Sequence, residues 1–153
     1  MKKVAIFDID GTVFRSSLLI ELTNTLIKKG IFPTSAKKIY LNAYKEWRDR
    51  SGSYEKYIGA VIKAFEQNIR GKSHKDVTRI AREVIAVQQN HTYRYTKNLV
   101  KELGREKYYI LAISNSPREI VEPFCKQLGF SKVYARVYEV GRDKKFTGKE
   151  LDD

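Results

Sequence analysis

The sequence predicts an α/β protein with a parallel sheet and a block of helices inserted after the first strand. Two apolar runs, at residues 3–8 and 108–114, favour the sheet. Each has the length of a buried strand and leads into oxygen-bearing side chains. A third observation favours the insert, because helical periodicity fills the segment between these runs. We therefore expect an α/β core at residues 1–15 and 93–153, and a helical insert at residues 16–92.

The first expected strand runs directly into two aspartates and a glycine. Asp8 and Asp10 are two residues apart, so their side chains point to one face of an extended segment. Gly11 permits the tight turn that ends the strand. Two carboxylates held close together repel each other, and Mg²⁺ offsets that repulsion while binding oxygen ligands. An ordinary strand closed by an Asp-Gly turn would show the same pattern, so the interpretation needs a second element.

The insert is expected to form about four helices, each marked by an apolar stripe and by signals at its ends. Gly30 and Ser51-Gly52 stop the first two helices, whereas Ser53 and Ser73 cap the next two. The aromatic residues in the stripes are interpreted as packing of a small bundle, not as a cofactor site. The stripes are Leu18, Leu22 and Leu26; Tyr40, Ala43, Tyr44 and Trp47; Tyr54, Tyr57, Ile58, Val61, Ile62 and Phe65; and Val77, Ile80, Ala81, Val84 and Gln88.

After the insert the pattern alternates between helices and strands, which predicts a parallel sheet with right-handed crossovers. Pro123 lies inside one of these helices and should kink or shorten it, because proline lacks an N–H. The expected elements are a helix at 93–103 ending at Gly104, a strand at 108–114, the helix with Pro123, a strand at 131–140, and a short return strand near Phe146 after a turn at 141–144.

The strand at 108–114 ends in small hydroxyl residues, and a helix is expected immediately after it. Ser116 suits the N-cap, Pro117 the first helical position, and Glu119 completes a capping box. The free N–H groups and positive dipole end of this helix would lie beside Ser114 and form a phosphate-binding site. A well-capped helix alone would explain Ser116, Pro117 and Glu119. It would not explain why both strands end in oxygen-bearing side chains.

These features together resemble the haloacid dehalogenase (HAD) superfamily, and specifically its phosphoserine-phosphatase-like subfamily IB. Residues 7–12 match the first motif, D-x-D-G-T, and residues 113–117 match the second, in which Ser or Thr ends the second strand. Matching stretches at 128–130 and 146–148 extend the resemblance over nearly the whole chain. The resemblance implies a HAD-like Rossmannoid parallel sheet with an inserted α-helical cap of the C1 type.

The resemblance also implies a Mg²⁺-dependent phosphomonoester hydrolase that acts on a small phosphorylated metabolite. Asp8 would be the nucleophile that forms an aspartyl-phosphate, and its second oxygen would bind the metal. Asp10 would act as general acid and then as base, while its backbone carbonyl binds the metal. The phosphoryl oxygens would be held by Ser114, the N–H of Asn115, and the backbone around Gly11 and Thr12.

The family's phosphoserine phosphatases hold the substrate amine with a glutamate shortly after the first motif. Ser17 occupies that position here, and Glu21 lies one helical turn farther on. Phosphoserine is therefore not favoured as the substrate.

Two further motifs of the family are not found: a lysine that opens a later helix, and an acidic pair that ends a fourth strand. Asp152-Asp153 does not qualify, because 149–151 is too short for the apolar strand that should precede the pair. We therefore expect an incomplete sheet and the N-terminal part of a longer enzyme. Residues 4–7 would then form an unpaired apolar edge, through which the chain should self-associate.

Composition limits the other functions. The 153 residues carry a net charge of +12, but the basic residues are scattered, so nucleic-acid binding is a minor alternative. Cys125 is the sole cysteine, and no run is long and apolar enough for a membrane span, which favours a cytoplasmic protein. A catalytically silent fragment that binds phosphate or a protein partner is the main alternative to the enzyme.

Overall fold

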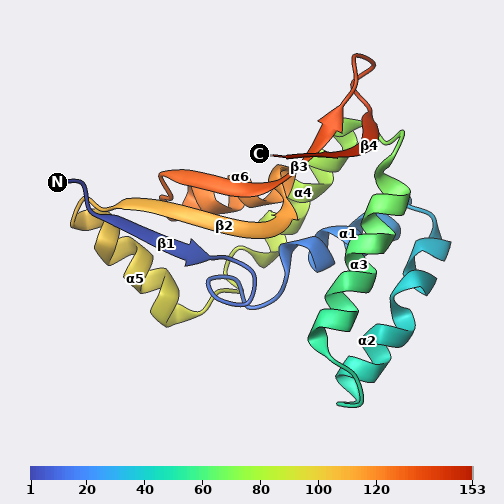
Figure 1. The fold of residues 1–153 in the computed structure, drawn as a ribbon, viewed down its shortest axis with the longest axis horizontal. Helices are drawn as coiled ribbons and strands as arrows, with labels where there is room; N and C mark the ends of the chain where they lie inside the picture. Colours follow the sequence, from blue (N-terminus) through green and yellow to red (C-terminus); the bar gives the residue numbers. More distant parts are fainter. Residues whose placement is uncertain (153) are drawn as a thin grey trace.

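The sheet in the computed structural model, which describes residues 1–152, has four strands in the order β1-β2-β3-β4 (Figure 1). β1 (Val4–Asp8), β2 (Tyr109–Pro117) and β3 (Lys132–Val140) are parallel, and β4 (Phe146–Leu151) is antiparallel to β3. The α/β class and the mostly parallel sheet are thus as the sequence predicts.

The helices follow the predicted stripes. Ser17, Ser53 and Ser73 accept hydrogen bonds from backbone N–H groups at the starts of their helices. None of the described helices combines the length and apolar character that a membrane span requires. The helical segments are α1 (Leu18–Lys28), the 3₁₀ helix η1 (Thr34–Ile39), α2 (Leu41–Arg48), α3 (Tyr54–Ile69), α4 (His74–Gln88), α5 (Arg94–Arg105) and α6 (Arg118–Leu128).

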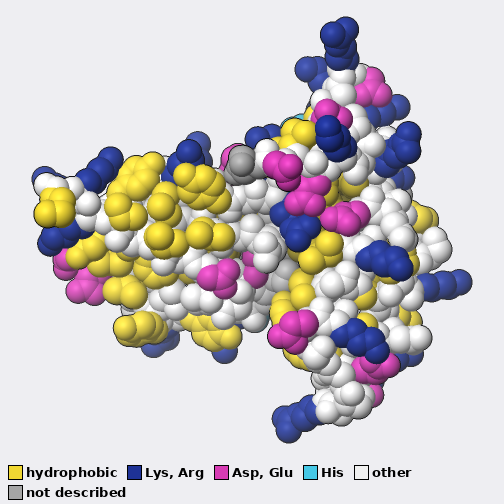
Figure 2. Space-filling view, viewed as in Figure 1, with side chains coloured by type: hydrophobic (Ala, Val, Ile, Leu, Met, Phe, Trp, Pro, Cys, Tyr) yellow, Lys and Arg dark blue, Asp and Glu magenta, His cyan; other side chains and the backbone are white. Residues whose placement is uncertain are grey.

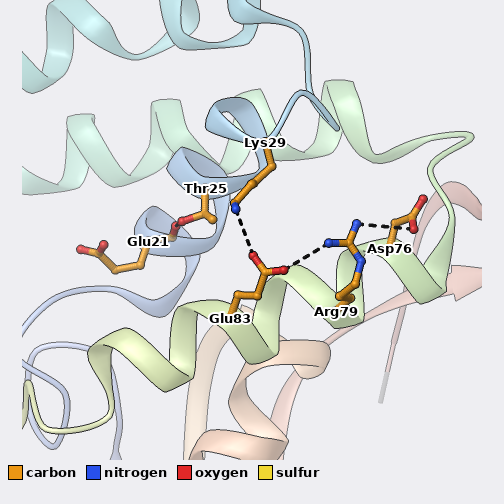
Figure 3. A network of polar contacts seen from close by, with 6 residues as sticks. All are labelled: Glu21, Thr25, Lys29, Asp76, Arg79 and Glu83. Carbon is orange, nitrogen blue, oxygen red and sulfur yellow. Dashed lines mark hydrogen bonds and ion pairs between the residues drawn. The ribbon is translucent and has the colours of Figure 1, made fainter.

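The helical block and the sheet share one hydrophobic core. Phe14, in the segment after β1, is fully buried and contacts Phe124 of α6 edge-on, with ring centroids 5.4 Å apart. Phe65 of α3 packs on Tyr138 of β3 at 5.3 Å. On the outer surface, an ion pair between Lys29, at the C-terminal end of α1, and Glu83 links α1 to α4, and Arg79 pairs with Glu83 within α4 (Figure 3). These pairs are solvent-exposed, so the apolar packing holds the block in place.

One helix end and the effect of one proline differ from the prediction. α5 continues through Gly104 to Arg105. The residue with a positive φ after this helix is Lys107, at 62°, and not Gly104. α6 continues through Pro123 to Leu128, so the proline does not shorten it.

The predicted capping box after β2 is wrong. α6 begins at Arg118, and Pro117 is its N-cap without any side-chain hydrogen bond. The Ser116 hydroxyl instead accepts from the N–H of Leu19 and donates to the carboxylate of Asp10, in the turn after β1. Glu119 is buried, which raises its pKa, and it lies 3.5 Å from Nε2 of His74. Contacts with residues about a hundred positions away therefore override the local capping pattern.

The C-terminal segment also differs from the prediction, because residues 149–151 belong to β4. β4 lies at the sheet edge opposite β1, so Asp152 does not join the first-strand aspartates. Asp153 lies outside the described residues.

Helices cover one face of β1 and β2, and the opposite face of these two strands leaves apolar side chains exposed in the described chain. α5 and α6 contact each other and both contact β2. The opposite face exposes Val4 (51 %), Ile6 (61 %) and Ile113 (48 %). Hydrophobic side chains gather over β1 and β2 in Figure 2. β1 is also an edge strand, as predicted, because β2 is its only partner among residues 1–152.

We expect two copies of the chain to associate through β1. Antiparallel pairing of two β1 strands would satisfy their free backbone groups and join the two apolar faces. It would also bring Lys2 and Lys3 of each copy toward Asp8 of the other, so the charges are complementary. Ile6→Lys should therefore reduce the concentration-dependent association measured by sedimentation velocity. Val87→Lys, at an exposed position on α4, should not. Association that is unchanged in Ile6→Lys would contradict this expectation.

Candidate functional site

The site begins at the tight turn that follows β1. The backbone carbonyl of Ile9 accepts from the N–H groups of Thr12, Val13 and Phe14 at 3.0–3.2 Å, and Gly11 adopts a φ of 78°. β1 thus ends at Asp8 and the chain reverses at once. The Asp8 carboxylate is exposed, and its Oδ2 accepts from the Thr12 hydroxyl at 3.0 Å. One carboxylate of the predicted pair is therefore open to solvent.

Asp10, by contrast, is turned inward. Its Oδ1 accepts from the N–H of Leu18 at 2.7 Å and from the hydroxyl of Ser116 at 2.9 Å. Its Oδ2 accepts a short hydrogen bond from the Ser114 hydroxyl. Burial raises the pKa of Asp10 and the nearby charge of Asp8 adds to this, while the three hydrogen bonds oppose the shift. The Asp10 carboxylate ties the start of α1 to the end of β2.

The predicted phosphate-binding residues separate into two groups. Asn115 is exposed, and with Asp8, Asp10 and Ser116 it lines a cavity of about 200 Å³. Ser114 is buried on the other face of β2, where its hydroxyl serves Asp10 and is not part of the lining. The structure therefore brings the two aspartates and Asn115 together and places Ser114 behind them.

A second cavity, of about 480 Å³, opens beside the first. Gly11 lies in the lining of this cavity. Thr12 does not line it, and its hydroxyl donates to Asp8. Asp10 and Tyr54 line both cavities, so the two spaces are neighbours. The wall opposite the β1 turn is aromatic and comes from α2, α3 and the residue that joins η1 to α2. Its aromatic residues are Tyr40, Tyr44, Trp47, Tyr54 and Tyr57.

The sequence interpretation missed this wall. It assigns the aromatic residues to packing alone, and they do pack: Trp47 stacks on Tyr57 with ring centroids 5.3 Å apart. The same side chains also face the cavity beside Asp10. The available signal is the clustering of five aromatic residues within positions 40–57.

Two oxygen donors at the end of β1 fit a magnesium ion that also binds substrate phosphate and water. The exposed Asp8 carboxylate and the Asp10 backbone carbonyl, to which no backbone N–H of the described chain donates, are hard oxygen ligands. No group of three acidic, His or Cys side chains suited to a metal occurs within residues 1–152. Mg²⁺ is commonly bound through one or two carboxylates together with substrate phosphate and water, so the donor set fits it.

No positive side chain neutralises the two carboxylates in the described part of the chain. Ion pairs within 4.0 Å involve neither Asp8 nor Asp10. Lys144 and Lys145 lie in the turn between β3 and β4, at the edge of the sheet opposite β1. Among residues 1–152, the groups that donate hydrogen bonds to these two carboxylates are neutral.

Comparison with known proteins gives a consistent family assignment. The model of the haloacid dehalogenase-like hydrolase family matches residues 5–153. A histidinol-phosphatase from Neisseria meningitidis serogroup C (strain 8013) is 27 % identical over 153 residues, which cover 99 % of this chain and 67 % of that protein.

Among solved structures, a protein of unknown function from Bordetella pertussis Tohama I matches with a TM-score of 0.75 at 14 % identity, over 99 % of this chain and 67 % of that one. A phosphoserine phosphatase from T. onnurineus in complex with NDSB-201 matches with a TM-score of 0.55 at 25 % identity, over 97 % and 63 %. The chain thus spans about two thirds of the length of these proteins.

Proposed function

We infer that this chain, which belongs to the haloacid dehalogenase-like hydrolase family, forms the nucleophile-bearing part of a Mg²⁺-dependent phosphomonoesterase for a small phosphorylated metabolite. The observation that carries this proposal is the exposed Asp8 carboxylate at a strand end, beside Asn115 and a cavity of about 200 Å³. A free carboxylate oxygen can there approach a phosphorus atom.

The proposed reaction has two steps. An Asp8 oxygen bonds to phosphorus as the bond from phosphorus to the leaving oxygen breaks, and water then cleaves the aspartyl-phosphate. The N–H of Asn115 would donate to a phosphoryl oxygen. A Mg²⁺ ion held by the Asp8 carboxylate and the Asp10 carbonyl would supply the positive charge that lets two anions meet. Thr12 would keep the Asp8 carboxylate oriented through its present hydrogen bond.

Asp10 is the proposed proton donor to the leaving oxygen. Its raised pKa, caused mainly by burial, favours the protonated form that a general acid needs. Its carboxyl is now bound by Ser114, Ser116 and the start of α1, so proton delivery requires the side chain to rotate toward the cavity. The two serines would stabilise the inward position between turnovers.

The names of the relatives suggest which substrates to assay first. Both histidinol phosphate and phosphoserine are phosphate esters of amino alcohols. Glu21 lines the cavity next to Asp10, so a carboxylate is available for a substrate amine even though Ser17 replaces the family's usual glutamate. We therefore propose amino-alcohol phosphates as the first class to test.

A catalytically silent phosphate-binding or partner-binding fragment is the second candidate. Within the described residues Asp8 forms no ion pair, and this favours the silent fragment. A positioned cation typically lowers the barrier to phosphoryl transfer by about 3 kcal/mol. No feature of the site favours a nucleic-acid ligand.

Hydrolysis of p-nitrophenyl phosphate with and without Mg²⁺ separates these functions. The enzyme hypothesis predicts turnover that requires added Mg²⁺ and is abolished by EDTA, because Asp8 cannot approach the phosphate dianion unaided. Calorimetric titration with inorganic phosphate in the same buffer serves as the comparison. Phosphate binding without any Mg²⁺-dependent turnover would support the silent fragment instead.

A further inference from the structure

A cavity of about 380 Å³ lies between α4 and α6, which pack side by side (Figure 1). It is distinct from the two cavities beside the β1 turn, because it shares no lining residue with either of them. Its volume is within the range of small-molecule binding sites. The helical insert contributes one wall through α4, and the α/β core contributes the other through α6.

Two buried oxygen atoms of the residues that line this cavity have no hydrogen-bond partner among residues 1–152. They are Oε1 of Glu119, whose side chain is only 4 % exposed, and Oγ1 of Thr78. One other buried side-chain atom of the described chain, Oγ1 of Thr23, is unpaired in this way. An unpaired buried polar atom costs about 1–3 kcal/mol, and more when the group is charged. Two such atoms at one cavity therefore indicate a ligand that donates hydrogen bonds.

His74 satisfies the Glu119 carboxylate only in part. Its Nε2 lies 3.5 Å from Oε1 without forming a hydrogen bond, and its ring packs on Phe146 with centroids 5.4 Å apart. Burial is the main cause of the raised pKa of Glu119. The charge of Glu122 raises this pKa further, whereas the charges of His74 and Arg118 lower it. A cation that enters the cavity would stabilise the buried carboxylate.

Three further side chains of the lining are exposed cations. Arg82 comes from α4, whereas Arg118 and Lys126 come from α6. None of the three forms an ion pair within 4.0 Å in the part of the chain that the structure describes. A guanidinium group binds a carboxylate through two parallel hydrogen bonds. The cavity thus combines a buried negative charge with exposed positive charges.

We propose that this cavity binds a free α-amino acid, whose ammonium group contacts Glu119 and Thr78 and whose carboxylate contacts the two arginines. Each charged group of such a ligand meets the opposite charge, and the ammonium group supplies donors for both unpaired oxygen atoms. A simple anion would satisfy the arginines but not Glu119, and a simple cation would do the reverse. The site is independent of the proposed function, because it includes neither Asp8 nor the cavities beside it.

Titrations followed by ¹H–¹⁵N NMR measure the binding and locate it in the structure. L-Alanine is compared with propionate and ethylammonium, each of which lacks one of its two charged groups. The wild-type chain should bind alanine at least about tenfold more tightly than either compound, because only alanine makes both charged contacts. The resonances that shift should belong to α4 and α6.

Substitutions separate the two ends of the ligand. Arg82→Gln should weaken alanine binding about tenfold and leave ethylammonium binding unchanged, whereas Glu119→Gln should weaken alanine binding and leave propionate binding unchanged. Arg105→Gln removes the same charge at an exposed position on α5 and should bind alanine as the wild-type chain does. Glu21→Gln, in the cavity beside Asp10, should do the same.

Three results would overturn the proposal: no measurable binding of alanine, equal binding of alanine and the singly charged compounds, or alanine binding that neither Arg82→Gln nor Glu119→Gln weakens. Shifts confined to the surroundings of Glu21 would place the amino acid in the other cavity and would also overturn it. A chain that binds alanine between α4 and α6 but hydrolyses no phosphate ester would contradict the proposed function alone.

Discussion

Asp8→Asn should lower Mg²⁺-dependent hydrolysis of p-nitrophenyl phosphate by at least about 10⁴-fold, the scale of loss when a covalent nucleophile is removed. The amide that replaces the carboxylate has no charged oxygen for attack on phosphorus. It can still accept the hydrogen bond from the Thr12 hydroxyl, so the turn should keep its geometry. The measurement is kcat at saturating substrate and Mg²⁺.

The fold should survive this substitution. Asp8 is exposed, and its negative charge is one cause of the raised pKa of Asp10. Removing that charge relieves a repulsion between two carboxylates. Asp49→Asn, at an exposed carboxylate beyond α2, is the matched control and should retain wild-type turnover. Equal activity in Asp8→Asn and the wild-type chain would eliminate Asp8 as the nucleophile.

Phe14→Ala should lower the free energy of unfolding by ~3–5 kcal/mol, as expected for truncation of a fully buried phenylalanine. Phe14 has no exposed surface and its ring contacts those of Phe124 and His91 at 5.4 and 5.9 Å. Its backbone N–H also donates to the Ile9 carbonyl within the turn that carries Asp10. Urea denaturation followed by circular dichroism measures the change.

Tyr95→Ala is the control for this loss of an aromatic ring. Tyr95 lies on α5 and is 79 % exposed, so its removal should change the unfolding free energy by less than about 0.5 kcal/mol. If Phe14→Ala changed the free energy of unfolding as little as Tyr95→Ala does, the segment after β1 would not be packed against α6 as described.

Local patterns were sufficient to predict most of the elements, including the strand and turn that carry the candidate site. The apolar run into Asp8-Ile9-Asp10-Gly11 predicts a strand followed by a turn, and alternation places Phe7 and Ile9 in the core, where both are buried. Helical stripes predict α1, α3 and α4, and serine caps predict the starts of α3 and α4, for the same reason: each depends on residues within a few positions.

The parts that local patterns could not predict depend on distant partners. Ser116 has the sequence context of an N-cap, yet its hydroxyl binds Asp10 and the N–H of Leu19 because the fold brings them within 3.0 Å. The inward turn of Asp10 follows from the same contacts. An aromatic stripe has the same spacing whether it faces a core or a cavity, so periodicity could not assign Trp47 and Tyr57 to the wall of a cavity.

The most direct measurement of the central claim is the mass of the chain quenched in acid during turnover with Mg²⁺ and substrate, followed by peptide mapping. The account predicts one added phosphoryl group, located on the peptide that contains Asp8 and absent from the Asp8→Asn chain. Phosphatase turnover in which the added group is found on another residue, or persists in Asp8→Asn, would contradict it.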